Sequence, residues 1–173
     1  MLTVADLVYR RLERLDAEKN LAESNDDFRR CLKIQRGIHD MHYLTKKNLK
    51  KFQTVLADHD KRCSLPLLAL IRKNRLRKYK PNCSSTQIRE FQKAWKNTHR
   101  NLYKLLDFFT YISNDTDDVL EIDLSIKDIG QIMSSFDAIV NNMEIAVDRI
   151  TMINEEFANL CILFDDIMLD KSV

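Results

Sequence analysis

The fold is decided by residues 129–167, which read IGQIMSSFDAIVNNMEIAVDRITMINEEFANLCILFDDI. In steps of three and four residues, this stretch carries an apolar side chain at every position of a coiled-coil seam. The seam comprises Ile129, Ile132, Phe136, Ile139, Met143, Ala146, Ile150, Ile153, Phe157, Leu160, Phe164 and Ile167. Adjacent positions add Met133, Val140, Val147, Cys161 and Met168. A stripe this wide suits a helix that packs against two neighbours, and the rest of the chain or a partner must cover it.

The composition predicts an all-α chain. Only two glycines and two prolines occur among 173 residues, too few for the turns of an all-β fold. Apolar periodicity predicts helices over residues 1–22, 26–62, 84–113 and 123–169. Between the second and third helices we expect a hydrophobic and basic corner over residues 63–83. We therefore predict a single domain, residues 1–173, folded as an elongated helical bundle of about four helices with coiled-coil character.

Local signals mark the ends of these helices. Ser84 with Gln87 three residues later has the form of a capping box, so a helix should begin there. The polar run over residues 113–118 is expected to end it in a turn. Within the second helix, Thr45 and Asn48 interrupt the apolar seam. This polar gap indicates either a buried group that fixes register or a seam that is locally solvated.

Charge is segregated along the chain, although the net charge is only +2. Residues 1–45 carry 8 basic and 8 acidic side chains, whereas residues 46–104 carry 17 basic and 3 acidic ones. Residues 105–173 carry 3 basic and 15 acidic side chains. Either the acidic segment packs against the basic one within the chain, or the two segments face different partners.

The basic segment is the main candidate for a charged binding surface. Its predicted patch consists of Lys46, Lys47, Lys50, Lys51, Arg72, Lys73, Arg75, Arg77, Lys78 and Lys80. Pairing with the chain's own acidic helix is the first interpretation, and docking of an acidic protein surface is the second. Nucleic acid comes third, with anionic membrane and the microtubule surface as related polyanions.

No catalytic or cofactor-binding pattern is present. Both glycines fall within predicted helices, so no Gly-rich phosphate loop is expected. His59 and Cys63 have the spacing of two zinc ligands on one helix face, but no further pair stands at a conventional distance. We therefore predict that the chain is not an enzyme and holds neither a metal nor a cofactor.

The remaining composition predicts a cytoplasmic location. The four cysteines have no paired spacing and are expected to be reduced thiols, as in the cytosol or the nucleus. Charged residues at Asp6 and Arg10 argue against a signal peptide. The longest apolar run, residues 65–71, is too short to span a bilayer, so no transmembrane segment is predicted.

The last 100 residues or so resemble the small shoulder subunit of dynactin, the cofactor of the dynein motor. The closing turn carries the resemblance through Phe157, Phe164, Asp165, Asp166, Ile167 and Met168. Before the third helix, Leu70, Ile71, Tyr79 and Pro81 resemble that family less closely. The N-terminal helix does not match well, and small subunits of kinetochore, spindle and vesicle-tethering complexes have similar heptads. The resemblance implies a structural subunit that serves microtubule-based transport in association with the cytoskeleton.

These observations predict an obligate subunit of a hetero-oligomer that binds other helical proteins. The predicted partner-binding residues are Ile145, Met152, Phe157, Leu160, Ile162, Leu163, Phe164 and Ile167. Ile145, Met152, Ile162 and Leu163 lie off the seam of the last helix, which favours a second contact face. The alternative function is a polyanion-binding module that uses residues 46–104.

Overall fold

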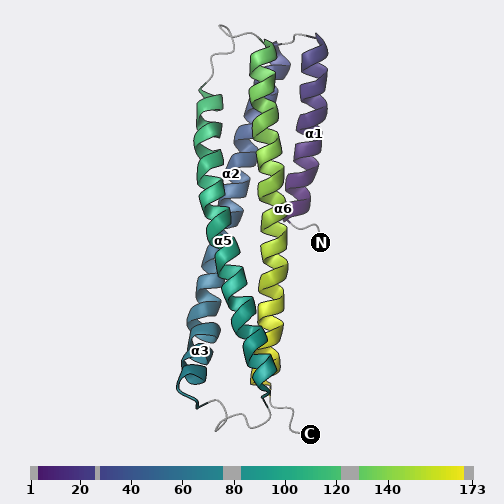
Figure 1. Ribbon diagram of the computed structural model, residues 1–173. Coiled ribbons are helices and arrows are strands. Elements are labelled where there is room, and N and C mark those ends of the chain that lie inside the picture. Colours follow the sequence, from purple (N-terminus) through teal and green to yellow (C-terminus); the bar gives the residue numbers. More distant parts are fainter. Residues whose placement is uncertain (1–3, 26–27, 76–82, 122–128, 170–173) are drawn as a thin grey trace. The chain divides into compact units, whose positions relative to one another are not determined.

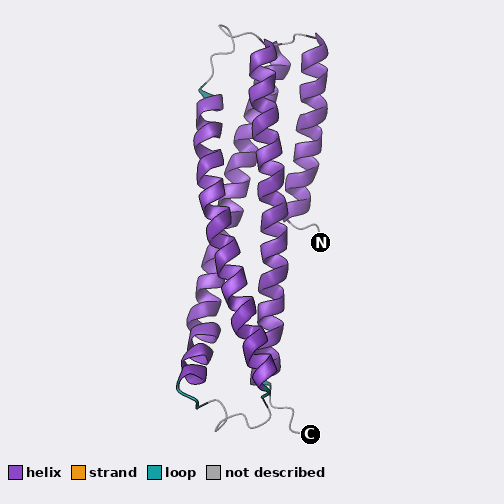
Figure 2. Cartoon of the chain, viewed as in Figure 1, coloured by secondary structure: helices purple, strands orange, loops and turns teal. Residues whose placement is uncertain are grey.

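The computed structural model describes residues 4–25, 28–75, 83–121 and 129–169, and nearly all of them are helical (Figure 1). The elements are α1 (Val4–Asn25), α2 (Phe28–His59), the π-helical turn η1 (Asp60–Ser64), α3 (Leu65–Arg72), α5 (Ser85–Leu120) and α6 (Ile129–Met168). Figure 2 shows no strand in these described ranges. The prediction of an all-α chain is confirmed.

The chain forms two compact units, each built from segments distant in sequence. Unit 1 contains residues 1–49 and 105–151, and unit 2 contains residues 50–104 and 152–173. Helices α2, α5 and α6 each contribute to both units, whereas α1 belongs to unit 1 and α3 to unit 2. The single domain predicted from the sequence stays a prediction.

In unit 1, α1 lies antiparallel to α2. The Arg11 guanidinium is 2.6 Å from Asp40, and the Lys33 ammonium is 2.7 Å from Glu18. Residue numbers therefore rise along one helix as they fall along the other. These ion pairs are exposed, so they set the register of the two helices more than they stabilise them.

The apolar stripe of α6 is buried in unit 1 on both its seam and its adjacent positions. The buried seam residues are Ile132, Phe136, Ile139, Met143, Ala146 and Ile150. The buried adjacent residues are Met133, Val140 and Val147. Cys31 of α2 contacts Met133 of this stripe at 4.0 Å. Beside the stripe, the Arg149 guanidinium of α6 lies 4.3 Å over the ring of Phe108 on α5. In unit 1, α6 therefore contacts both α2 and α5, as a wide apolar stripe predicts.

The predicted capping box opens α5. The Ser84 backbone N–H donates to Gln87 Oε1 at 2.9 Å, and the Gln87 N–H donates to Ser84 Oγ at 3.1 Å. The predicted end at residue 113 is wrong, because α5 continues to Leu120. Thr116 is buried, and its hydroxyl donates a hydrogen bond to the Ile112 carbonyl one turn earlier. This side chain is therefore hydrogen-bonded within the helix and does not end it.

The predicted corner is partly wrong as well. α2 ends as an α-helix at His59, three residues before the predicted end, and passes through the π-helical turn directly into α3. Pro66 occupies the first turn of α3, where a missing backbone N–H costs no hydrogen bond. α3 ends beyond Arg72, where Asn74 adopts φ 51° and donates its N–H to the Ile71 carbonyl at 3.1 Å. Residues 76–82 of the predicted corner lie outside the described residues, as do 26–27 and 123–128 of the predicted helices.

Candidate partner-binding surface

The end of α6 packs into a small core of unit 2. Leu160 and Ile167 of α6 are fully buried with Leu67 of α3 and Phe91 of α5. Partly buried side chains around them are Leu68, Ile71, Cys83, Ile88, Ala94, Trp95, Phe157, Leu163 and Phe164. The seam of this helix segment is therefore occupied by the chain's own α3 and α5.

Aromatic rings fix the orientation of the two α6 phenylalanines in this core. The Phe157 ring lies edge-on to Phe52 at 5.7 Å and to His59 at 5.3 Å between centroids. The Phe164 ring lies 5.8 Å from His59 and 6.3 Å from Phe91. Of the predicted partner-binding residues, Phe157, Leu160, Phe164 and Ile167 thus pack within the chain.

A different face of the same helix segment is exposed. Ile162 of α6 is 58% exposed, and Leu169, the first residue after the end of α6, is 66% exposed one heptad later. The Leu169 N–H still donates to the Asp165 carbonyl at 2.7 Å, so the helical hydrogen-bond pattern reaches this residue. Leu163 is only half-exposed because it packs against the unit 2 core. The outward apolar face of this segment is therefore formed by Ile162 and Leu169 rather than by the predicted pair Ile162 and Leu163.

The other two predicted contact residues are also exposed. Ile145 in unit 1 is 43% exposed, and Met152 in unit 2 is 47% exposed. Both remain available to a partner.

A shallow hollow of about 320 Å³ adjoins Leu163 in unit 2. It is lined by Glu90, Lys93, Ala94, Asn97, Asn159 and Leu163, and so lies between α5 and α6. Ala94 and Leu163 supply its apolar part, while the remaining side chains are polar or charged. Its small size and mixed lining suit one side chain of a protein partner better than a small-molecule substrate, whose pockets enclose most of the ligand.

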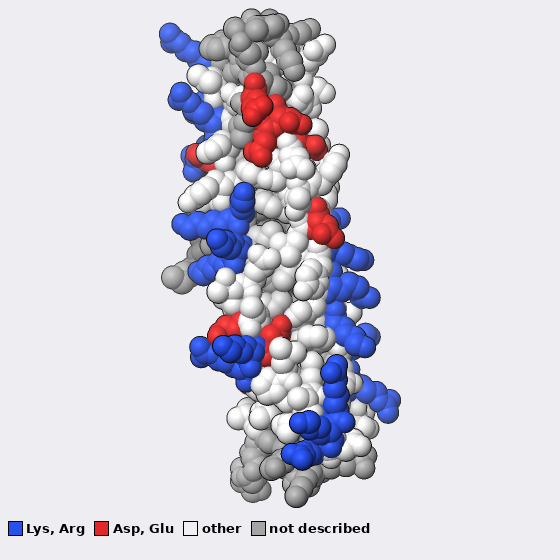
Figure 3. All heavy atoms as spheres, turned by 90° about the vertical axis from the view of Figure 1, so that its left-hand side faces the viewer, with Lys and Arg blue, Asp and Glu red and all other residues white. Residues whose placement is uncertain are grey.

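The predicted basic patch is solvent-exposed wherever the structure describes it. Lys46, Lys47, Lys50 and Lys51 project from α2, and Arg72, Lys73 and Arg75 lie at and beyond the end of α3. Figure 3 shows Lys and Arg side chains standing out along both edges of the view. Arg77, Lys78 and Lys80 lie outside the described residues.

A second row of basic side chains, which was not predicted, lies on α5. This row, called here the α5 basic row, consists of Arg89, Lys93, Lys96, Arg100 and Lys104, and all five are exposed. Their spacing of three or four residues places them on one helix face, and this spacing was the pattern that could have revealed them.

The described ion pairs do not join the basic segment, residues 46–104, to the acidic segment, residues 105–173. Among the described residues, no Lys or Arg of residues 46–104 forms an ion pair with a carboxylate of residues 105–173. Arg62 pairs with Asp58 within its own segment at 2.9 Å. Asn101 donates to Glu156 at 2.7 Å, which is a hydrogen bond from a neutral group. The first interpretation of the basic segment is therefore unsupported by the described contacts.

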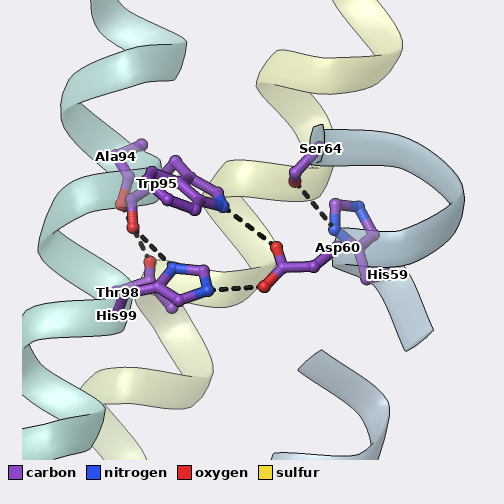
Figure 4. Close-up of polar contacts among 7 residues, drawn as sticks. All are labelled: His59, Asp60, Ser64, Ala94, Trp95, Thr98 and His99. Carbon is purple, nitrogen blue, oxygen red and sulfur yellow. Dashed lines mark hydrogen bonds and ion pairs between the residues drawn. The ribbon is translucent and has the colours of Figure 1, made fainter. Parts of the chain in front are cut away.

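Unit 2 also holds a half-buried polar cluster that no sequence pattern predicts. Figure 4 shows Asp60 reaching from the π-helical turn to two side chains of α5. One carboxylate oxygen accepts from Trp95 Nε1 at 3.0 Å, and the other lies 2.5 Å from His99 Nε2. His99 Nδ1 lies 2.8 Å from the Trp95 carbonyl oxygen. Both ring nitrogens thus face oxygen acceptors, and both can donate only when the ring carries two protons.

This cluster is arranged as a structural tie rather than a catalytic site. The side chains of His99 and Asp60 are only 19% and 15% exposed. Beside them, Ser64 Oγ lies 3.2 Å from His59 Nδ1, but Ser64 is completely buried and out of reach of a substrate. A buried hydroxyl cannot act as a nucleophile on an external molecule. The cluster instead joins the π-helical turn to α5.

The other candidate chemical residues have inert surroundings. His42 stacks on Phe109 and contacts Ser113 Oγ at 2.9 Å, and burial lowers the pKa of its imidazole. Burial also raises the pKa of the Cys161 thiol, and the nearby Asp165 carboxylate raises it further. A thiol with a raised pKa is a poor nucleophile. Within the described ranges, no three His, Cys, Asp or Glu side chains are grouped to hold a metal ion, and His59 and Cys63 gain no third ligand.

No described helix combines the length and apolar character needed to cross a membrane. Comparison with protein-family models, with curated proteins and with solved structures finds no match to this chain.

Proposed function

We propose that this chain is a non-enzymatic structural subunit of a multiprotein assembly and binds a helical partner through the end of α6. The supporting observation is the pair Ile162 and Leu169, which remain exposed although the neighbouring seam of the same helix is filled by the chain's own core. Exposed apolar side chains that recur by the heptad on a helix are the pattern that a second helix recognises. The hollow beside Leu163 gives such a partner a place for one side chain.

The resemblance to the small shoulder subunit of dynactin gives this proposal its most specific form. In that form the chain is an elongated helical bundle in the cytoplasm and serves microtubule-based transport as part of an obligate hetero-oligomer. The two-unit packing of long helices is compatible with such a bundle.

Replacing Ile162 and Leu169 by Glu tests the proposal. The double variant Ile162→Glu/Leu169→Glu should keep the helical circular dichroism spectrum of the wild type, because neither side chain lies in the core. It should also lose the proteins that co-purify with the tagged wild-type chain, identified by mass spectrometry. Val55→Glu is the matched control, since Val55 is an exposed apolar residue of α2 in the same unit. A folded double variant that retains every co-purifying protein would refute this face as the interface.

The alternative function is a polyanion-binding module, and the exposed α5 basic row specifically supports it. Binding to nucleic acid or an anionic vesicle releases counterions, so its affinity should fall steeply with added salt. The apolar contact proposed above should not weaken in this way. Fluorescence anisotropy with a labelled DNA duplex at two salt concentrations distinguishes the two functions.

A further inference from the structure

The outward charges of α5 change sign near its middle. The α5 basic row occupies residues 89–104, in unit 2. In unit 1, Asp107 is exposed in the middle part of the same helix, Asp117 and Asp118 are exposed near its end, and Glu121 is exposed just after it. Asp115 is half-exposed. Arg100 hydrogen-bonds to Asn97 at 2.7 Å, but no member of the basic row forms an ion pair among the described residues.

Two exposed tyrosines flank the change of sign. Tyr103 is 64% exposed and Tyr111 is 62% exposed, and they lie four residues before and four residues after Asp107. Tyrosine is enriched in protein interfaces because its ring buries a large area while its hydroxyl tolerates water. Along α5 the order is thus basic, tyrosine, Asp107, tyrosine, acidic.

This order is complementary to itself when the helix is reversed. We propose that α5 binds antiparallel to α5 of a second copy of this chain, with a two-fold axis at Asp107. Lys96 then faces Asp118 of the second copy, and Lys93 faces Glu121 of the second copy. Tyr103 faces Tyr111 of the second copy, and the symmetry forms every pair twice.

The centre of this arrangement is also compensated. The two Asp107 carboxylates meet near the axis, where like charges oppose association. Lys104 is exposed and one helical turn from Asp107, so each copy brings a cation close to the opposing carboxylate. The proposed contact uses no residue of α6, although Lys93 also lines the hollow beside Leu163.

Charge complementarity favours a second copy over a nucleic acid as the occupant of this face. A polyanion would be attracted by residues 89–104 but repelled by the acidic side chains that follow on the same helix. A reversed copy satisfies both halves. Exposed ion pairs are individually weak and are screened beyond about 10 Å at 0.1 M salt, so the association should be strongest at low salt.

Sedimentation velocity of the full chain tests the charge pairing. The wild type should be dimeric in about 50 mM salt and shift towards monomer in about 500 mM salt, because screening weakens the pairs. Lys93→Glu/Lys96→Glu and Asp118→Lys/Glu121→Lys should each weaken the dimer at least tenfold. An equimolar mixture of these two variants should regain a dimer, because each supplies the charge that the other now needs. Circular dichroism checks that both variants are folded.

A symmetric cross-link tests the register. Asp107→Cys should form an intermolecular disulfide on mild oxidation, because the two copies of this residue meet at the axis. Asn114→Cys is the matched control, since it is exposed on the same helix but would lie about 20 Å from its counterpart. The wild type gives the background from its four native cysteines.

Four results would overturn the proposal. The first is a wild-type chain that stays monomeric at low salt and high protein concentration. The second is a mixture of the charge-reversed variants that does not associate. The third is equal cross-linking of Asp107→Cys and Asn114→Cys, which would indicate random collision. Tight binding of the wild type to a DNA duplex, lost in Lys93→Glu/Lys96→Glu without any change in mass, would assign the basic row to a polyanion instead.

Discussion

The contribution of Asp60 to stability can be predicted from its two hydrogen bonds. Its carboxylate accepts from Trp95 Nε1 and His99 Nε2, and its side chain is only 15% exposed. Asp60→Ala removes both acceptors and leaves two half-buried donors unpaired. Hydrogen bonds to charged groups contribute about 1.5–3 kcal/mol each, and the remaining exposure lets water replace part of this. We expect Asp60→Ala to lower the free energy of unfolding by about 3 kcal/mol.

Asp60→Asn separates the loss of charge from the loss of hydrogen bonds. The Asn carbonyl oxygen can accept from Trp95 Nε1, while the Asn amide can donate to His99 Nε2 when that nitrogen carries no proton. This variant should therefore cost only about 1 kcal/mol, the difference between a charge-assisted and a neutral hydrogen bond.

The assay is urea-induced unfolding followed by circular dichroism, with Asp58→Ala as the control. Asp58 lies two residues away, and its side chain is 54% exposed in an ion pair with Arg62. An exposed pair contributes little, so the control should change stability by less than about 1 kcal/mol. Equal losses for the Ala and Asn variants of Asp60, or an Ala variant no less stable than the control, would refute the structural role of the cluster.

Three further predictions concern unit 1. Thr45 Oγ1 is buried without a hydrogen-bond partner, so Thr45→Val should raise the free energy of unfolding by about 1–2 kcal/mol in urea titrations, and a loss would contradict this. Burial lowers the pKa of His42 in the folded protein below its ordinary value of 6.5. The neutral ring therefore favours the folded protein above pH 6.5, and this stability is lost as the pH falls through the folded-state pKa. His42→Gln should reduce the drop in melting temperature between about pH 7.5 and 5.5. A Cβ at Gly37 would lie 2.1 Å from Leu15 Cδ2, so Gly37→Ala should destabilise by about 1–3 kcal/mol from overpacking, and Leu15→Ala in the same chain should relieve part of that cost in a double-mutant cycle.

Periodicity predicted the core of α6 well, because a helix with an uninterrupted apolar stripe must bury it somewhere. Ile132, Phe136 and Leu160 were all placed correctly on the buried seam. The capping box at Ser84 was equally predictable, since both of its hydrogen bonds are local. Periodicity is a poorer guide towards the end of α2, where the apolar side chain of Val55 is 44% exposed and that of its neighbour Leu56 is buried.

Features that depend on tertiary contacts could not be predicted from the sequence. The π-helical turn at Asp60 coincides with bonds to Trp95 and His99, which lie 35 and 39 residues further along the chain. Thr45 in the polar gap of α2 is buried rather than solvated, and nothing in its local sequence distinguishes the two outcomes. The composition of the basic segment indicated pairing with the acidic segment. The Lys and Arg side chains that the structure describes in this segment are instead exposed to solvent.

The end of α6 shows why a heptad pattern alone does not locate an interface. Phe164 lies on the predicted seam and Ile162 lies off it, yet both residues were predicted to bind a partner. Only packing separates them, because α3 and α5 supply a core for Phe164 and leave Ile162 in water. An apolar side chain that is buried within its own chain contributes to the free energy of folding. An exposed apolar side chain contributes to the free energy of association when a partner buries it. Both proposed interfaces, at the end of α6 and on α5, therefore consist of side chains that packing within the chain leaves exposed.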